Sequence, residues 1–454
     1  MRVIRWSLIL AWAAIVGSLP LGAFTIPPQY PDVDLADVTP YFWVEGDMPD
    51  QSLGHAVTMG DVNGDGFDDL VFSQPTASPY TGIEAGQVHI LYGGDLRGHF
   101  ILPGAPGRTR ILGQMEGDRV GQSLAVADFN SDGFDDVAIG APHVVRNDIP
   151  TDTVYIVWGS DDLPDIITLG TRDTVMTRIV NPVMDFMGTP VSVDLGRALA
   201  AGNFDGDGYT DLIIGAPLWT LGQYGEELGH VYVLYGAFNL SSASVINMGT
   251  ASTGVRTVIE GYFNQIPLQL PLVGWSLAAG DMDDDSHDDI AIGVPNFGPF
   301  DTSAGQGRVH VVYGRSRPTS TLYLDDAPDT LTVEPSWNYG QDGRLGSAVA
   351  MGHYNSDPYA DLLMGAPGDG QDDAVNGSAY IVRGQSFRPS VFYLDTTPGT
   401  DHAIYVGNSG LDELGAAVAL ADTNGDGLDD IIIGAPGDNV TGDIGRYDSG
   451  AVYE

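Results

Sequence analysis

Cysteine and lysine are both absent from this chain of 454 residues. Without cysteine there can be no disulfide bond, no thiolate metal ligand and no cysteine nucleophile. Without lysine, the 18 basic residues are all arginine, and 61 acidic residues oppose them to give a net charge of −43. Binding to nucleic acid or to an anionic membrane surface depends on clustered basic side chains. The composition therefore argues against both partners.

Long apolar runs are equally scarce, and the one that stands out lies at the N-terminus. Arg2 and Arg5 precede the apolar run Trp6–Val16, and small residues follow it up to Ala23. This is the pattern of a secretory signal, and the run is shorter than the roughly 20 residues that span a membrane. We predict a signal peptide over 1–23 and a secreted, extracellular or cell-surface protein over 24–454, with no membrane span in the mature chain.

Aspartate is present in excess, and much of it lies in a unit that recurs six times. The second copy reads Val120-Gly-Gln-Ser-Leu-Ala-Val-Ala-Asp-Phe-Asn-Ser-Asp-Gly-Phe-Asp-Asp-Val-Ala-Ile-Gly-Ala-Pro142, and the acidic loops of successive copies start 67 to 78 residues apart. A fixed period of this kind is typical of repeat architectures.

Each unit is rich in Val, Ile and Tyr between Gly, Pro and Asp, which predicts four short strands and no long helix. Four-stranded units that repeat around an axis hide their sheet edges, as in a β-propeller. The fold class is therefore all-β, a propeller of six visible repeats with six or seven blades. Residues 41–45 look like a fourth strand without a preceding unit, and 450–453 start a third strand, so we expect an N-terminal strand to close the ring.

The acidic loops follow the pattern Asp/Asn-x-Asp/Asn-x-Asp-Gly-x-x-Asp, which places side-chain oxygens at the first, third, fifth and ninth residues. Alternate oxygens can converge on one centre, and hard oxygen ligands suit Ca²⁺. The predicted metal ligands are Asp61, Asn63, Asp65 and Asp69; Asp128, Asn130, Asp132 and Asp136; Asn203, Asp205, Asp207 and Asp211; Asp281, Asp283, Asp285 and Asp289; and Asp422, Asn424, Asp426 and Asp430. The sequence thus predicts five Ca²⁺ sites.

Two alternatives bear on these loops. An EF-hand needs a glutamate at the twelfth position, which here holds Phe72, Ile139, Ile214, Ile292 and Ile433. Metal-free acidic turns are the other alternative, and five loops with the same ligand spacing disfavour it. Ser286 replaces the loop glycine in the fourth copy, which should weaken that site. The fifth loop, His353 to Asp361, has Pro358 instead of the glycine, and whether it binds calcium stays open.

These repeats resemble the FG-GAP repeats of the integrin α-chain N-terminal propeller. The resemblance is carried by Leu-Gly or Val-Gly before each loop, by the loop itself and by Gly-Ala-Pro after it, as at Gly140–Pro142 and Gly215–Pro217. Ser73-Gln-Pro75 and Gly293-Val-Pro295 depart from that last motif. The resemblance implies calcium on one face and contacts to a ligand or partner on the other.

Similar repeats accompany a zinc catalytic domain in secreted lipid-cleaving enzymes. No stretch is left here for such a domain, so we predict a protein that is not an enzyme.

The remaining connectors share the face opposite the loops and carry aromatic residues suited to recognition: Tyr80, Trp219, Tyr224, Tyr262, Phe263, Phe297, Phe300, Trp337 and Tyr339. The leading hypothesis is an adhesion or interaction scaffold for an extracellular protein. A carbohydrate-binding lectin with a glycan ligand is the alternative, and a hydrolase or lyase with a central site is a third. Asn239, Asn376 and Asn439 start sequons, which predicts a glycoprotein in a host that glycosylates.

Overall fold

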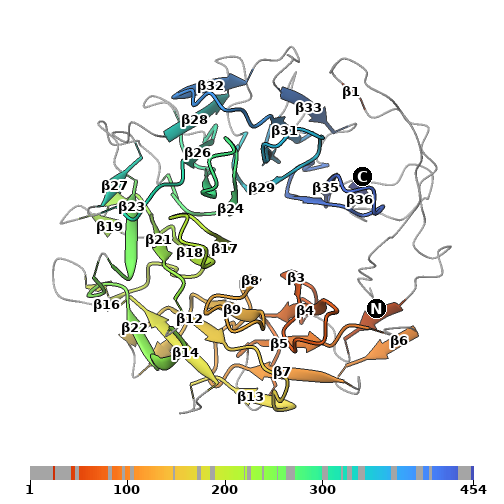
Figure 1. The fold of residues 1–454 in the computed structure, drawn as a ribbon, viewed down its shortest axis with the longest axis vertical. Helices are drawn as coiled ribbons and strands as arrows, with labels where there is room; N and C mark the ends of the chain where they lie inside the picture. Colours follow the sequence, from red (N-terminus) through yellow and green to blue (C-terminus); the bar gives the residue numbers. More distant parts are fainter. Residues whose placement is uncertain are drawn as a thin grey trace.

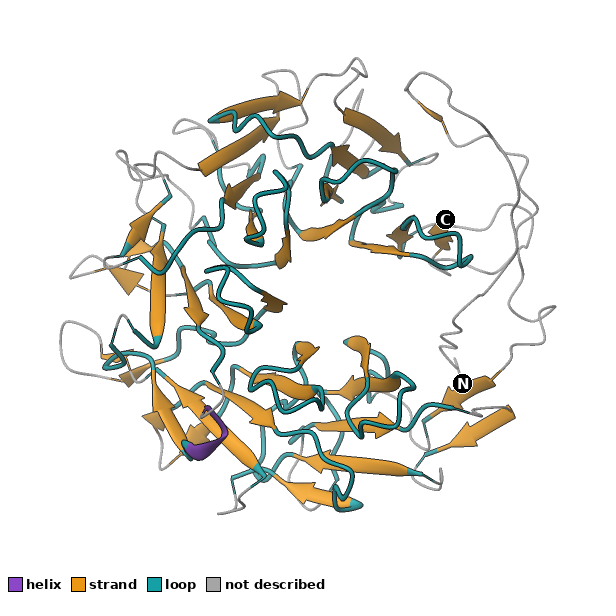
Figure 2. Cartoon of the chain, in the orientation of Figure 1, coloured by secondary structure: helices purple, strands orange, loops and turns teal. Residues whose placement is uncertain are grey.

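The computed structural model arranges the chain as a ring of small sheets (Figures 1 and 2). It describes residues 24–25, 42–46, 51–79, 84–94, 98–102, 107–146, 149–170, 175–181, 183–184, 190–218, 220–221, 226–237, 240–252, 254–261, 271–298, 305–318, 321–324, 330–335, 343–369, 376–394, 402–407, 412–437 and 451–453. Within these ranges the helical content is one 3-10 turn at Leu240–Ser242. The predicted all-β propeller is thus confirmed, while the signal peptide lies outside the described residues.

Five repeats each form a blade of four antiparallel strands in chain order. The blades are β3 (Val57–Gly60), β4 (Asp69–Gln74), β5 (Gln87–Leu91) and β7 (Arg108–Leu112); β8 (Leu124–Ala127), β9 (Asp136–Ala141), β12 (Thr153–Val157) and β14 (Met176–Val180); β17 (Leu199–Gly202), β18 (Asp211–Ala216), β21 (His230–Leu234) and β23 (Arg256–Glu260); β24 (Leu277–Gly280), β25 (Asp289–Val294), β26 (Arg308–Val312) and β28 (Thr330–Pro335); and β29 (Ala348–Gly352), β30 (Asp361–Ala366), β31 (Ser378–Val382) and β33 (His402–Val406). The sixth repeat contributes β34 (Ala417–Ala421), β35 (Asp430–Ala435) and β36 (Ala451–Tyr453).

Each complete blade also has a fifth strand, which the sequence analysis missed. It pairs in parallel with the blade's fourth strand. In the first four blades it comes from the segment before the fourth strand of the next repeat, and in the fifth blade it comes from the N-terminal residues 24–25. These strands are β13 (Ile166–Thr168) on β7, β22 (Val245–Asn247) on β14, β27 (Leu322–Tyr323) on β23, β32 (Val391–Leu394) on β28 and β1 (Phe24–Thr25) on β33. The exchange covers an outer edge that would otherwise expose unpaired backbone groups.

The N-terminal strand β2 (Phe42–Glu45) pairs in parallel with β6 (Gly98–Ile101). β6 comes just before the fourth strand of the first blade, β7, which is where the fifth strands of other blades come from. Its partner β2 therefore occupies the place of a fourth strand. Among the described residues no ladder joins β2 to β36, and closure of the ring by an N-terminal strand stays a prediction. Three two-stranded hairpins decorate the connectors: β10 (Val145–Arg146) with β11 (Ile149–Pro150), β15 (Val183–Met184) with β16 (Pro190–Val191), and β19 (Thr220–Leu221) with β20 (Glu226–Glu227).

The core lies between neighbouring blades. The second strands of the five complete blades are buried along their whole length, and one apolar cluster joins Ile156 of the second blade to Leu212 of the third. Phe129 and Phe204, the second residues of their acidic loops, are fully buried. The loops are therefore anchored in the core by an apolar residue as well as by the flanking strands.

The Gly-Ala-Pro motif has a packing cause. A Cβ atom on Gly140 would lie 2.1 Å from the carbonyl oxygen of Gly196, and one on Gly215 would lie 2.2 Å from that of Gly274. Each pair joins the second strand of one blade to the Leu-Gly or Val-Gly glycine of the next. The two glycines that carry the repeat resemblance therefore touch each other between blades, which explains why both belong to the motif.

Candidate calcium sites

The acidic loops connect the first and second strands of each blade and all lie at the same end of the ring. In every loop but the fifth, the fourth and sixth residues have left-handed backbone, as at Gly64 and Gly66 with φ of 71° and 87°. Glycine adopts this conformation without strain, which is why it recurs at the sixth position. Ser286 takes the same conformation with φ of 70°, so the fourth loop keeps the turn in spite of its substitution.

Side chains of the first, third and fifth residues turn inward and accept hydrogen bonds from the loop backbone. In the first loop the amides of Asp65 and Gly66 donate to the carboxylate of Asp61, at 3.0 and 2.8 Å. Asp65 also donates to Asn63, and Phe67 donates to Asp65. Similar bonds to the first residue recur in the second, fourth and sixth loops. The loops thus gather the predicted oxygen ligands, as short Asp and Asn side chains do in turns.

The ninth residue has a second role that the sequence analysis missed. The carboxylate of Asp136, which is fully buried, accepts hydrogen bonds from the amides of Phe129 and Gly159, at 3.0 and 2.9 Å. Asp69, Asp211 and Asp289 make the corresponding pair of bonds. Each of these predicted ligands therefore also ties its loop to the end of the blade's third strand.

Burial raises the pKa of these ninth residues, and the neighbouring loop carboxylates raise it further. The hydrogen bonds from the backbone amides lower it, but by less. The pKa reaches about 8 at Asp136 and Asp289, about 7 at Asp211 and about 6 at Asp69. Carboxylates crowded in this way favour a cation among them. Electrostatics therefore give a reason for metal binding at these four loops.

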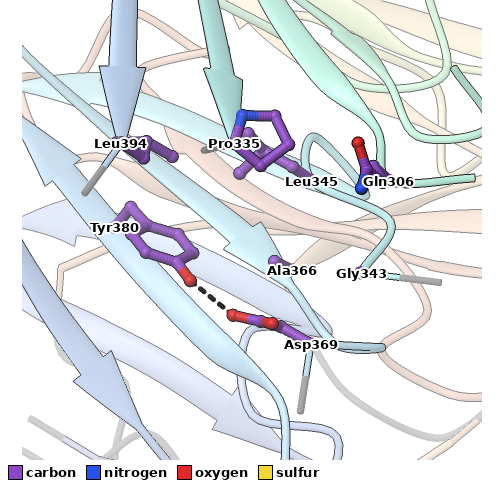
Figure 3. Close-up of a pocket in the computed structure, with 8 residues that line it drawn as sticks. All are labelled: Gln306, Pro335, Gly343, Leu345, Ala366, Asp369, Tyr380 and Leu394. Atoms are coloured by element: carbon purple, nitrogen blue, oxygen red, sulfur yellow. Dashed lines mark hydrogen bonds between the residues drawn. The ribbon is translucent and has the colours of Figure 1, made fainter. Parts of the chain in front are cut away.

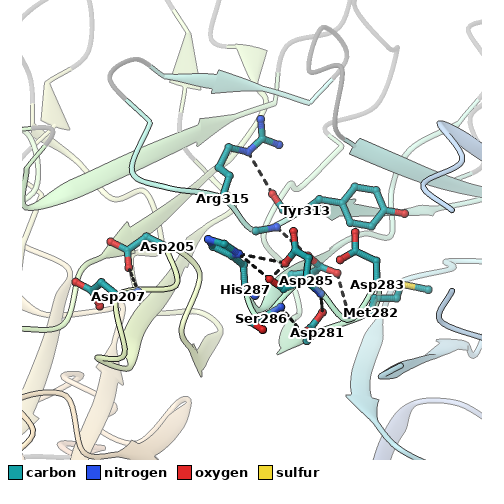
Figure 4. A network of polar contacts seen from close by, with 12 residues as sticks. Asp205, Asp207, Asp281, Met282, Asp283, Asp285, Ser286, His287, Tyr313 and Arg315 are labelled. Carbon is teal, nitrogen blue, oxygen red and sulfur yellow. Dashed lines mark hydrogen bonds and ion pairs between the residues drawn. The ribbon is translucent and has the colours of Figure 1, made fainter. Parts of the chain in front are cut away.

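The fourth loop brings three carboxylates closest together (Figure 4). Oxygens of Asp281, Asp283 and Asp285 all lie within 4.8 Å of one another. Such an all-oxygen donor set fits a hard divalent cation. The carboxylate of Asp289, the ninth residue of this loop, accepts hydrogen bonds from the amides of Met282 and Gly314. The residues present thus fit the predicted Ca²⁺, with Asp281, Asp283 and Asp285 as the side chains that would hold it.

Two arginines reach into these loops from neighbouring blades. Arg317 contacts Asp205 and Asp207 of the third loop, and its guanidinium lies 4.5 Å from the centre of the Tyr235 ring. Arg388 contacts Asp283 and Asp285 of the fourth loop. The sequence analysis missed both arginines, although each precedes a proline shortly after a third strand. Their charges stand close to where a cation would bind.

The fifth loop differs from the others. Its Asn355 donates to Asp361 at 2.9 Å, and a His353 ring nitrogen lies 3.1 Å from the carbonyl oxygen of Tyr359. Arg383 from the same blade donates to the hydroxyl of Tyr354 at 2.7 Å. These side chains are engaged with one another, and whether the loop binds calcium stays open.

The loops also link adjacent blades. Asp135 of the second blade accepts a hydrogen bond from the amide of Asp61 and returns one from its own amide, at 2.9 and 3.0 Å. Asp288 and Asp429 make the same reciprocal contact with Asn203 and His353. Ordering one loop therefore also fixes an edge of the next blade.

The opposite face offers little enclosed space in the described part of the chain. A crevice of about 210 Å³, open solvent included, lies between the fourth and fifth blades near Leu345 and Leu394 (Figure 3). Inside it the hydroxyl of Tyr380 donates to Asp369. The space inside it is about 10 Å³, enough for at most one water molecule, so the crevice is too small to hold a ligand.

The aromatic residues predicted for this face are mostly outside the described residues, as are Asn239 and Asn439. Phe297 is described, and it packs against the core with the Arg308 guanidinium 3.2 Å from its ring centre. Local packing thus accounts for Phe297. Asn376 is partly buried and its Nδ2 donates to Gly407 at 3.3 Å, so a glycan on this nitrogen would leave it one hydrogen for that contact.

This geometry defines the class of protein, a β-propeller whose blades each carry an acidic loop between the first two strands. The FG-GAP repeat family model matches residues 53–91, 120–157, 195–234, 273–312 and 414–454. Five of the repeats are therefore FG-GAP repeats, and the predicted resemblance to the integrin α propeller is confirmed. The fifth repeat, with its divergent loop, is not among the matched segments.

Named relatives extend the comparison. Phosphatidylinositol-glycan-specific phospholipase D from Bos taurus is 28% identical over 435 residues, which cover 89% of this chain and 46% of the relative. The Homo sapiens protein of the same name is 29% identical over 437 residues, with the same two shares. Integrin alpha-PS2 from Drosophila melanogaster is 32% identical over 203 residues, or 43% of this chain and 12% of the relative. The chain thus spans about half the length of the phospholipases that it matches.

One prediction is contradicted by these relatives. The sequence analysis concluded that the protein is not an enzyme, because no separate catalytic domain was evident. The phospholipases that align with 89% of the chain are named as enzymes, so that conclusion was wrong. Its premise was weak, because the extent of one sequence says little about the protein that carries the propeller.

Within the described ranges, no helix is long and apolar enough to cross a membrane.

Proposed function

We propose that this chain is the calcium-binding propeller of an enzyme that acts on phosphatidylinositol-glycan anchors, and that its connector face holds the anchored protein or another partner. The observation that carries the proposal is the alignment with phosphatidylinositol-glycan-specific phospholipase D over 89% of the chain. We further propose that the protein is secreted or at the cell surface, where such anchors are displayed.

Calcium has a structural role in this proposal. The five loops with matching ligands join the first two strands of a blade, and three of the six loops also bond to the next blade. With 61 acidic residues and no disulfide, the ring benefits from cations that neutralise crowded carboxylates. Extracellular calcium sites have dissociation constants of about 10⁻⁴–10⁻³ M, and we expect these loops to fall in that range.

The test uses the purified chain and a protein that carries a phosphatidylinositol-glycan anchor in detergent micelles, with calcium or with EGTA. We expect calcium-dependent capture of the anchored protein, and a form lacking the anchor should be captured less. Release of the protein from its anchor, measured in the same samples, would place hydrolysis within the chain itself. A folded, calcium-loaded chain that neither captures nor cleaves the anchored protein would contradict the proposal.

An integrin-like interaction scaffold is the second candidate, favoured by the 32% identity to integrin alpha-PS2 over 203 residues. In this case the ligand is an extracellular protein without an anchor. A lectin-like propeller is a variant in which the ligand is a glycan. A panel of extracellular proteins and a glycan array, each probed with calcium and with EGTA, separates these from the anchored-protein reading.

A further inference from the structure

The residue that follows the Leu-Gly or Val-Gly pair differs from one repeat to the next. In the first four repeats it is His55, Gln122, Arg197 and Trp275, whereas the last two repeats have small residues. These positions precede the first strand of each blade, at its opposite end from the acidic loop. Because β3, β8, β17 and β24 lie side by side around the inner ring, the four side chains come from neighbouring strands.

Two contacts show that these side chains meet across blades. The amide Nε2 of Gln122 lies 2.8 Å from Nε2 of His55, 67 positions away in the sequence. The guanidinium carbon of Arg197 lies 4.0 Å from the centre of the Trp275 ring. A guanidinium stacked on an aromatic face is held in orientation while its N–H edge stays available.

The guanidinium of Arg197 has N–H groups that can donate hydrogen bonds to a ligand. Among the residues that the structure describes, no carboxylate or carbonyl accepts a hydrogen bond from its guanidinium, although the side chain is half-buried. Asp194, which is buried, interacts with it through charge alone. The nitrogens of Arg197 are not among the enclosed polar atoms of the described residues, so they stay accessible to a ligand from solvent.

A second histidine stands beside this group. His143, from the connector after β9, interacts through charge with Asp194, Arg119 and Arg197. Burial lowers the pKa of His143; Asp194 opposes this effect, while the two arginines add to it. Burial and then Arg197 lower the pKa of His55. Both rings are therefore neutral at pH 7, and each has one N–H that can donate.

We propose that His55, Gln122, Arg197 and Trp275 form an oxyanion-binding site at the connector end of the inner ring, which takes a phosphate or carboxylate group of a ligand. The guanidinium edge would bind two oxygens of the anion, since charge-assisted bidentate bonds are the strongest that arginine makes. Gln122 and His55 would supply further donors. The site rests on these contacts and not on the proposed function.

The rest of the molecule offers an anion few alternatives to this site. All positive charge comes from 18 arginines against 61 acidic residues, and Arg317 and Arg388 are engaged with acidic loops. A small anion is repelled by most of such a surface. A free guanidinium at the opposite end from those loops is therefore a place where an anion can bind.

Titration calorimetry on the full calcium-loaded chain tests the proposal with two probes, glycerol 2-phosphate and acetate, at constant ionic strength. We expect saturable binding with a dissociation constant of about 1 mM, and the better probe shows whether the natural group is a phosphate or a carboxylate. Arg197→Gln should weaken binding at least tenfold, and Arg197→Lys less. Arg344→Gln, in the equivalent turn before the fifth blade, is the matched control and should bind as the parent does.

Histidine ring signals in NMR spectra of the unmodified chain give a second readout that needs no variant to fold. On adding the better probe, the signals of His55 and His143 should shift, while those of His287 and His353 on the loop face should not. Absence of saturable binding to both probes would overturn the proposal. So would equal binding by the Arg197→Gln and Arg344→Gln variants, or shifts confined to the loop face.

Discussion

The side chain of Arg317, from the fourth blade, contacts Asp205 of the third blade's acidic loop and lies 2.5 Å from an oxygen of Asp207. The arginine thus places a positive charge beside a loop that bears several carboxylates. Arg388 makes the same contact with the fourth loop. In both places the charge that a cation would supply is partly supplied by a neighbouring blade.

Removing this charge should favour calcium. We expect Arg317→Gln and Arg388→Gln each to tighten one calcium site by several-fold to about tenfold, because a partly exposed charge contact is worth about 1 kcal/mol. Arg315→Gln is the matched control, since its Nε donates to the carbonyl of Tyr313 (Figure 4). Calorimetric calcium titrations measure the effect. Unchanged or weaker affinity in Arg317→Gln would show that the arginine does not compete with the cation.

The buried carboxyl group of Asp136, which bonds to the amides of Phe129 and Gly159, makes the stability of the fold depend on pH when calcium is absent. Burial raises its pKa from 3.8 to about 8, so the folded state holds a proton that the unfolded chain releases. The stability that this proton provides is complete below pH 3.8 and is lost as the pH rises through 8. Between pH 5 and 8, the calcium-free chain should lose at least about 1 kcal/mol more than Asp136→Asn does.

Thermal denaturation of the calcium-free parent and of Asp136→Asn at pH 5 and pH 8 measures this difference. Calcium should remove it, because the cation stabilises the charged carboxylate. Parallel pH profiles of the two proteins would mean that Asp136 is already ionised in the calcium-free fold.

Local patterns predicted the repeats, the propeller and the loops, because each depends on residues close together in the sequence. The fifth strands could not be predicted in this way. β13 has three residues and β27 two, and each pairs with another repeat, so no periodicity marks them. The contact of Gln122 with His55 escaped notice for a related reason, since comparing repeats emphasises what they share and these positions differ.

The buried histidines of the third strands should make the fold sensitive to acid. Burial, followed by repulsion from Arg108 and Arg110, lowers the pKa of His89 from 6.5 to about 3. The unfolded chain therefore binds a proton first, and stability present above pH 6.5 is lost as the pH falls toward 3. His89→Gln, which stays neutral, should lose roughly 3 kcal/mol less than the parent between pH 7 and pH 4.

Chemical denaturation at the two pH values gives this comparison directly. The same substitution at His230, whose pKa burial also lowers to about 3, should act in the same direction from the third blade. If both variants lose as much stability as the parent, protonation of other groups controls unfolding by acid.

The glycine pairs between blades can be tested one at a time. Gly215→Ala places a Cβ atom 2.2 Å from the carbonyl oxygen of Gly274, a backbone atom that cannot move without shifting the neighbouring blade. Overpacking of this kind costs about 1–3 kcal/mol, so the melting temperature should fall by several degrees. Gly434→Ala is the control, because the nearest atom to its Cβ is 3.4 Å away on Ala417 of the same blade. Calorimetric melting of the calcium-loaded proteins should show a loss for Gly215→Ala and almost none for Gly434→Ala. Equal losses would mean that the contact between blades is not what requires glycine at this position.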